Sequence, residues 1–114
     1  MSPQALAAAA LALPGAALSI QWGDDRVYKV GGKMFAATDG PGTSLSFKAT
    51  DIAFEALTQS GRAVPARYLA RAKWVTFDDV SALEGSEVAD WLKTAHALVA
   101  PKLTRAVRAE LGLA

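Results

Sequence analysis

The segment of residues 64–75 contains the greatest concentration of side chains that could contact a nucleic acid. It has three cationic residues, two aromatic residues and no acidic residue: Arg67, Tyr68, Arg71, Lys73 and Trp74. Guanidinium and ammonium groups can pair with phosphates, and aromatic rings beside them can stack on bases or make cation–π contacts. The composition of this segment therefore predicts a phosphate-contacting surface.

The spacing within this segment suggests how its cations would be presented. If residues 66–72 form one or two helical turns, Arg67 and Arg71 are four residues apart and share a helix face. An alternative interpretation is structural. In it, Tyr68 and Trp74 fill the core, and the cations are solvated or paired with acids such as Asp78 or Asp79.

Other candidate motifs favour structural roles. Gly31-Gly32-Lys33 lacks the remainder of a phosphate-binding loop and is typical of a hairpin turn between two strands. The chain has no cysteine and one histidine, His96, so a zinc site is not expected. No nucleophile, base and orienting group are recognisable together. We therefore expect a non-enzymatic protein without a metal or cofactor.

Length and charge limit the possible classes of protein. The 114 residues are typical of one domain, spanning residues 1–114. Twelve basic and eleven acidic residues give a nearly neutral chain, which argues against a protein that coats nucleic acid but permits a local basic face. The uncharged run Ala5–Trp22 follows no basic residue and is interrupted by Pro14-Gly15. This favours a soluble cytoplasmic protein over an exported or membrane-spanning one.

The elements that must position these residues follow from periodicity and capping signals. Leu18, Ile20 and Trp22 alternate with polar residues, which predicts a half-buried strand. The expected helix caps are Ser2, Thr50 or Asp51, and Ser86. In order, we expect a helix at 3–13, strands at 18–22, 26–30, 33–37 and 45–47, a helix at 51–59, a strand at 74–77, a helix after 86, and a helical stripe after Pro101. This order predicts an α+β fold, with an antiparallel sheet of about five strands and helices packed on one face.

Four stretches in one order carry a family resemblance: residues 10–16, Trp22-Gly23, residues 27–36 and residues 68–75, with Leu98-Val99 and Lys102-Leu103 closing the pattern. In these stretches the chain resembles the MmcQ/YjbR family over about residues 5–103. The resemblance implies a CyaY-like fold, the frataxin-type α+β sandwich. It leaves residues 104–114 as a C-terminal helical extension.

Members of that family are often described as DNA-binding through a double-wing arrangement. On matching positions this implies contacts from Lys29, Lys33, Arg71 and Lys73, with Tyr68 and Trp74 nearby. Arg67 replaces the expected proline and adds a cation, and Pro101 interrupts the closing helix. CyaY-like proteins that bind iron use acidic ridges, whereas the first helix here has no acid, so iron binding is not expected.

The leading hypothesis is weak, salt-dependent binding of DNA through phosphates. The alternative is a protein-interaction module or a binding module for a small anionic ligand. A concave apolar pocket beside Tyr68 and Arg71 would favour the alternative, and a flat or convex basic face would favour nucleic acid.

Overall fold

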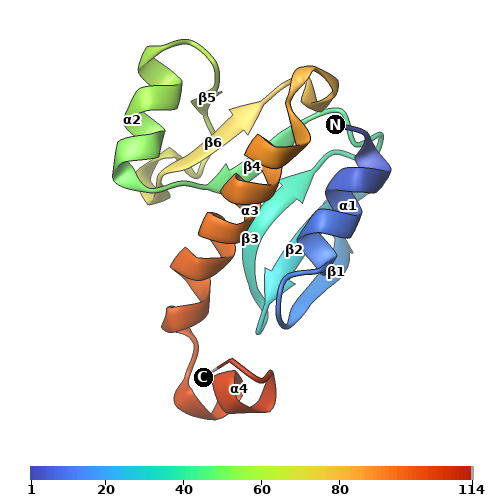
Figure 1. Ribbon diagram of the computed structural model, residues 1–114, viewed down its shortest axis with the longest axis vertical. Helices are drawn as coiled ribbons and strands as arrows, with labels where there is room; N and C mark the ends of the chain where they lie inside the picture. Colours follow the sequence, from blue (N-terminus) through green and yellow to red (C-terminus); the bar gives the residue numbers. More distant parts are fainter. Residues whose placement is uncertain (114) are drawn as a thin grey trace.

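The computed structural model of the protein describes residues 1–113 and has an α+β architecture (Figure 1). Its helices and strands are α1 (Pro3–Leu11), β1 (Ala16–Gln21), β2 (Asp25–Val30), β3 (Lys33–Thr38), β4 (Leu45–Lys48), α2 (Asp51–Gln59), β5 (Val64–Pro65), β6 (Trp74–Phe77), α3 (Gly85–Val99) and α4 (Arg105–Glu110). Short 3-10 turns occur at η1 (Ala70–Ala72), η2 (Val80–Ala82) and η3 (Ala100–Lys102).

The strands form one antiparallel sheet in the order β1-β2-β3-β4-β6-β5. The predicted α+β class is therefore confirmed, as is the Gly31-Gly32 turn between β2 and β3. The sheet has one strand more than the approximately five expected. The additional strand, β5, has only two residues, one of them Pro65, so it has no periodicity that could be recognised in the sequence.

Helices α1 and α3 lie across the same face of the sheet (Figure 1). Because side chains alternate along a strand, every second residue points toward these helices. Phe47 of β4 and Phe77 of β6 stack with Trp91 of α3, with ring centroids 5.5 and 4.9 Å from the tryptophan ring. Leu6 of α1 and Leu92 of α3 join the same buried cluster. This packing makes one face of the sheet the hydrophobic core.

Two of the predicted helix caps are confirmed. Ser2 Oγ accepts a hydrogen bond from Ala5 N at 3.1 Å, and Thr50 Oγ1 accepts one from Ala53 N at 3.0 Å. The assignment of Ser86 as a cap is wrong. Helix α3 begins at Gly85 with Glu84 in the capping position, and Ser86 Oγ donates to the Glu84 carboxylate from within the first turn.

The chain turns at Pro101 and forms a separate helix, α4, whose Thr104 cap accepts a hydrogen bond from Val107 N. Leu103 belongs to the core cluster, and Val107 and Leu111 pack against it. The apolar stripe after Pro101 therefore packs on its own domain. The predicted extension ends at residue 114, which lies outside the described residues.

The predicted strand is confirmed as β1, but the prediction that its apolar residues are half-buried is wrong. Leu18, Ile20 and Trp22 are exposed. Leu18 and Ile20 pair with Tyr28 and Arg26 of β2, but β1 is an edge strand and has a neighbouring strand on one side only. Its apolar side chains consequently receive less cover than those of the central strands. No helix within residues 1–113 is both long enough and apolar enough to cross a membrane.

His96 has a structural position. Its ring is buried, its Nε2 lies 2.7 Å from the Pro14 carbonyl oxygen, and it packs edge-on against Phe35 at a centroid distance of 5.5 Å. A ring N–H at Nε2 donates to that carbonyl, which ties the turn after α1 to helix α3.

The loop after β3 is closely fitted to the start of α1. Asp39 accepts hydrogen bonds from Thr43 N and Thr43 Oγ1, both at 2.7 Å. Partial burial would raise the pKa of Asp39, but hydrogen bonds from Thr43, Ser44 and Gly42 outweigh it and lower that pKa. Gly42 has φ +77°, and a Cβ atom there would lie 2.7 Å from Pro3 Cβ.

Gly42→Ala should therefore destabilise the fold more than Gly61→Ala. Both glycines have φ +77°, but a Cβ at Gly61 would meet no atom within 4 Å. The left-handed backbone alone should cost about 1 kcal/mol in each variant. The Pro3 clash should add roughly 1–3 kcal/mol in Gly42→Ala. Urea unfolding of both variants measures the difference, and equal losses of unfolding free energy would show that the contact between loop and helix is unimportant.

Candidate ligand-binding groove

A groove of about 540 Å³ crosses the sheet face opposite α1 and α3. Ser46 and Thr76 define this face, because they alternate with the core residues Phe47, Val75 and Phe77. The lining residues come from five strands or strand ends and the loop before η1: Trp22, Asp25, Met34, Ala37, Ser46, Ala66, Arg67, Tyr68, Leu69, Trp74 and Thr76.

Two aromatic residues of the groove are unusually exposed for their type. Trp22 is 67% exposed and Tyr68 is 93% exposed. Both have left-handed backbones, with φ 52° at Trp22 and φ 67° at Tyr68. This conformation costs roughly 1 kcal/mol or more for a non-glycine residue, and such strain tends to occur at functional sites. Together, exposure and backbone strain make these two rings the leading candidates for ligand contacts.

Charged and polar groups of the groove are few. The Arg67 guanidinium lies over the Tyr68 ring, with Cζ 5.8 Å from the ring centroid. Asp25 contributes one carboxylate. The hydroxyl groups of Ser46 and Thr76 bond to each other at 2.8 Å. The groove is thus largely apolar, with one cation and one acid among its lining residues.

The structure brings three of the seven predicted site residues into this groove: Arg67, Tyr68 and Trp74. Trp74 is only 4% exposed, so it contributes buried surface and cannot be an exposed stacking platform. The burial that the structural interpretation expects is therefore found for Trp74 and not for Tyr68, although Trp74 is buried on the groove face and not in the core cluster.

The prediction that Arg67 and Arg71 share a helix face is wrong. Only Ala70–Ala72 form a helical turn, and it is a 3-10 turn. Tyr68 reverses the backbone direction between the two arginines. Arg71 is exposed on η1 and does not line the groove.

The neighbouring lysines have other contacts. Lys73, with φ 64°, places its Nζ 4.9 Å from the centroid of Phe54 on α2. Lys48 donates to the Ala72 carbonyl at 2.8 Å, which ties η1 to β4. Partial burial, reinforced by the charge of Lys102, lowers the pKa of Lys48, and Asp51 opposes this effect. In residues 1–113 the one ion pair is Arg62–Glu87, so neither Arg71 nor Lys73 pairs with Asp78 or Asp79.

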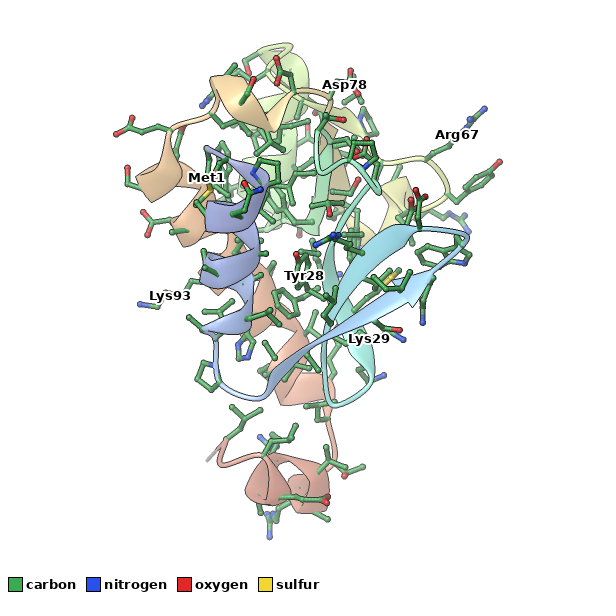
Figure 2. All side chains as sticks on the ribbon, turned by 90° about the vertical axis from the view of Figure 1, so that its right-hand side faces the viewer. Met1, Tyr28, Lys29, Arg67, Asp78 and Lys93 are labelled. Atoms are coloured by element: carbon green, nitrogen blue, oxygen red, sulfur yellow. The ribbon has the colours of Figure 1, made fainter. Side chains whose placement is uncertain are left out.

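The two lysines implied by the family resemblance lie on the hairpin of β2 and β3. Lys29 is partly buried and pairs across the sheet with Met34, which lines the groove, so its side chain lies on the groove face. Lys33 is exposed beside the turn. Figure 2 shows Lys29 on β2, well separated from Arg67, which projects from the loop before η1. Of the predicted cations, Arg67 is the one that lines the groove, whereas Lys29 and Lys33 belong to the hairpin of β2 and β3.

Trp22 is a candidate site residue that the sequence prediction missed. Its alternation with Leu18 and Ile20 suggested a buried position. The sequence does contain one indication against burial of Trp22: Gly23-Asp24 follows it and predicts a turn. A residue beside a turn no longer has to follow the inward–outward alternation of the strand.

Comparisons with known proteins agree with this fold. A family model described as YjbR matches residues 11–98. The crystal structure of the Deinococcus radiodurans protein DR2400, which has a DUF419 domain, is similar with a TM-score of 0.83 and 28% sequence identity. The similarity covers 99% of this chain and 89% of that one. No curated protein matches the sequence.

The YjbR model spans most of the chain, from the end of α1 to the last turn of α3, and the similar structure covers nearly all of it. The resemblance seen in the sequence is thereby confirmed, and the chain belongs to the YjbR family.

Proposed function

We propose that the protein binds single-stranded nucleic acid, and that the groove receives its nucleotide units. Trp22 and Tyr68 would provide faces on which bases stack, and Arg67 would contact a phosphate. The observation that carries the proposal is the exposure of these two aromatic rings, with their strained backbones, at one groove. Stacking on aromatic side chains beside cations is the common mode of single-strand recognition.

The shape of the groove favours a single strand over a duplex. A volume of about 540 Å³ is within the range of small-molecule sites, roughly 300–1,000 Å³. A base that has left its stack can enter such a space, whereas a paired base in duplex DNA cannot present its face to Tyr68. By the criterion given above, a concave apolar groove beside Tyr68 favours the alternative ligands, a peptide or a small anionic molecule. Among nucleic acids it suits unpaired nucleotides, so the exposed aromatic rings, and not the shape alone, support the choice of a single strand.

Charge supports weak binding with a modest dependence on salt. Arg67 lines the groove and Lys29 lies next to it, so both can attract phosphates. The Asp25 carboxylate also lines the groove and would repel a phosphate bound close to it. Lys33, Arg71 and Lys73 do not line the groove. About two phosphate contacts on a single strand give a slope of log affinity against log salt of roughly −1.4.

We propose binding without catalysis. The aliphatic hydroxyl groups of the groove, on Ser46 and Thr76, hydrogen bond to each other, and no histidine lies beside them or the Tyr68 phenol among the lining residues. A concave, mainly apolar groove also suits the alternative ligands, a peptide or a small anionic molecule. Both are therefore included as competing outcomes of the binding experiments.

Tyr68→Ala and Trp22→Ala should each weaken binding of a labelled oligonucleotide of about ten nucleotides, measured by fluorescence anisotropy. Each base–aromatic stack contributes about 1–3 kcal/mol, equivalent to a loss of roughly 5- to 150-fold. Ile52→Ala is the matched control, because Ile52 is an exposed apolar residue of α2 that does not line the groove. An effect of Ile52→Ala equal to that of the aromatic variants would contradict the assignment, and tighter binding of duplex would contradict the choice of a single strand.

Arg67→Gln should reduce the salt slope by about 0.7 for single-stranded ligand, because one phosphate contact is lost. Arg71→Gln removes the same charge from outside the groove and should leave the slope unchanged. Titrations at several salt concentrations measure both slopes. If a mononucleotide binds as tightly as the oligonucleotide, the ligand is a small molecule. If only peptides bind, the groove is a protein-interaction site.

A further inference from the structure

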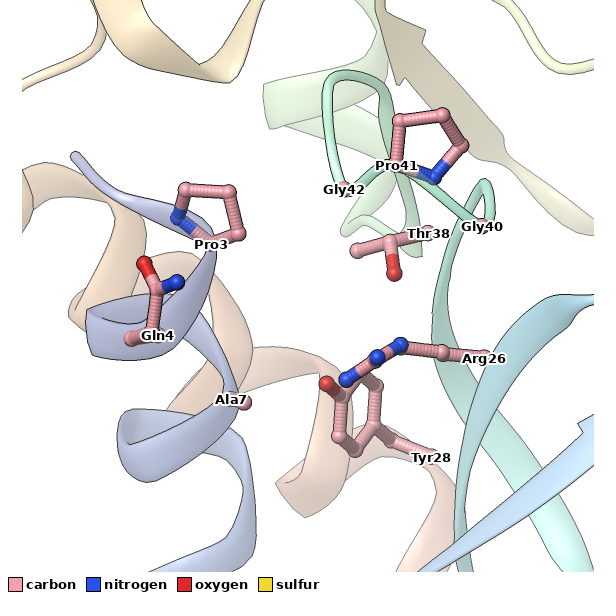
Figure 3. A pocket seen from close by; sticks show the side chains of 9 residues that line it. All are labelled: Pro3, Gln4, Ala7, Arg26, Tyr28, Thr38, Gly40, Pro41 and Gly42. Carbon is pink, nitrogen blue, oxygen red and sulfur yellow. The ribbon is translucent and has the colours of Figure 1, made fainter.

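A second cavity, of about 400 Å³, lies on the opposite side of the sheet, between α1 and the strands β2 and β3 (Figure 3). Its lining residues are Pro3, Gln4, Ala7, Arg26, Tyr28, Thr38, Gly40, Pro41 and Gly42. Four of these carry polar side chains, and they come from three different elements: Gln4 from α1, Arg26 and Tyr28 from β2, and Thr38 from β3. We refer to this cavity as the helix-side pocket.

The polar groups of the helix-side pocket converge. In Figure 3 the Arg26 guanidinium extends over the hydroxyl end of Tyr28, and the Thr38 hydroxyl points toward the same space from the other side. Tyr28 is 1% exposed and Thr38 is 5% exposed, so both side chains are more than nine-tenths buried. Both residues line the pocket, so their hydroxyl oxygens are accessible from its interior.

None of the side-chain hydrogen bonds within residues 1–113 involves Gln4, Arg26, Tyr28 or Thr38. The hydroxyl oxygens of Tyr28 and Thr38 are open to the pocket, since within residues 1–113 the one fully buried side-chain polar atom without a partner is Arg108 Nε. Two hydroxyl groups without protein partners, beside an arginine at one cavity, offer convergent donors to a polar ligand.

The charge of the pocket determines the class of ligand. Arg26 forms no ion pair within residues 1–113, and no acidic residue lines the pocket. The carboxylate of Asp24 lies against Gly40, a residue of the pocket wall, so it places a negative charge near the pocket, but it forms no ion pair with Arg26. Burial raises the pKa of the Tyr28 phenol, although the Arg26 charge opposes this, so at neutral pH the hydroxyl keeps its proton and can donate it. The donors that line the pocket suit an acceptor with negative charge.

The walls of the pocket are fixed by the fold. Gly42 lies directly against Pro3, and Asp39 fixes the loop through its hydrogen bonds to Thr43. Tyr28 packs in the hydrophobic core. A site whose donors are held in place before binding loses less conformational entropy when the ligand arrives.

We propose that the helix-side pocket binds a small molecule that carries a carboxylate or a phosphate group. Arg26 pairs with the anionic oxygens, the hydroxyl groups of Tyr28 and Thr38 donate to them, and the Gln4 amide offers a further donor. Pro3, Ala7 and Pro41 cover the apolar part of the ligand. The site is independent of the groove, because Arg26 and Tyr28 lie on the face of β2 opposite to Asp25.

The test titrates inorganic phosphate and succinate separately into the protein and follows binding by isothermal calorimetry and by backbone amide shifts in NMR spectra. We expect saturable binding of at least one probe at millimolar concentration or below, with shifts at β2, β3 and the start of α1. Saturation by inorganic phosphate would indicate a phosphate ligand, and saturation by succinate would indicate a carboxylate ligand. Failure of both probes to saturate would overturn the proposal.

Arg26→Gln should lower the affinity for the probe that binds by about tenfold or more, because a charge-assisted contact is lost. Tyr28→Phe should weaken it by about fivefold without lowering the melting temperature, because this hydroxyl has no partner in the protein. Arg105→Gln is the control, since it removes one positive charge from exposed α4. Equal effects of Arg26→Gln and Arg105→Gln, or a lowered melting temperature in Tyr28→Phe, would overturn the assignment.

The proposal for the groove and the proposal for the helix-side pocket can be tested independently of each other. Arg26→Gln should leave oligonucleotide binding unchanged, and Tyr68→Ala should leave phosphate or succinate binding unchanged, because the sheet separates the two sites. Loss of oligonucleotide binding in Arg26→Gln would show that the anion site belongs to the nucleic-acid surface and would overturn its independence.

Discussion

The packing of α3 across one face of the sheet is the interaction on which the other features depend. Trp91 stacks on Phe47 and Phe77, and His96 reaches the Pro14 carbonyl, so one helix connects β4, β6 and the turn after α1. Stacked aromatic rings contribute about 0.5–1.5 kcal/mol beyond the area they bury. Because this face holds the core, the opposite face of the sheet is free to carry the groove.

Side chains alternate between the two faces of the sheet along β2, so adjacent residues of this strand line different cavities. Asp25 lines the groove, whereas Arg26 and Tyr28 line the helix-side pocket. The period of two in a strand produces this separation without any insertion or extra domain. A chain of this size can therefore carry two chemically different cavities, one mainly aromatic and the other rich in donors, on opposite sides of one sheet.

The backbone conformations of Trp22 and Tyr68, the two exposed aromatic residues of the groove, depend on the surrounding fold. A left-handed backbone at Trp22 and Tyr68 is unfavourable, so neighbouring contacts must maintain it. Buried Trp74 anchors the chain after η1, and Lys48 anchors η1 itself through the Ala72 carbonyl. These contacts hold the loop that exposes Tyr68 to solvent, so a ligand at the groove would meet a ring that is already positioned.

The sequence by itself determined the features that depend on neighbours along the chain. The Ser2 and Thr50 caps, the Gly31-Gly32 turn and the α+β order follow from local hydrogen bonds and from periodicity, so they could be predicted. Composition was also sufficient to select the segment that contains Arg67 and Tyr68. Residues 11–98 carry enough of the family pattern to be assigned to the YjbR family.

Only the tertiary structure decided which of these residues meet. Trp22 joins Tyr68 across the sheet, and Arg71 is excluded, because the loop before η1 reverses its direction at Tyr68. The helix-side pocket combines Gln4 with Thr38 and two residues of β2, and no spacing in the sequence connects them. Such convergence arises from strand register and from the docking of α1, which are set by long-range packing and not by any local signal.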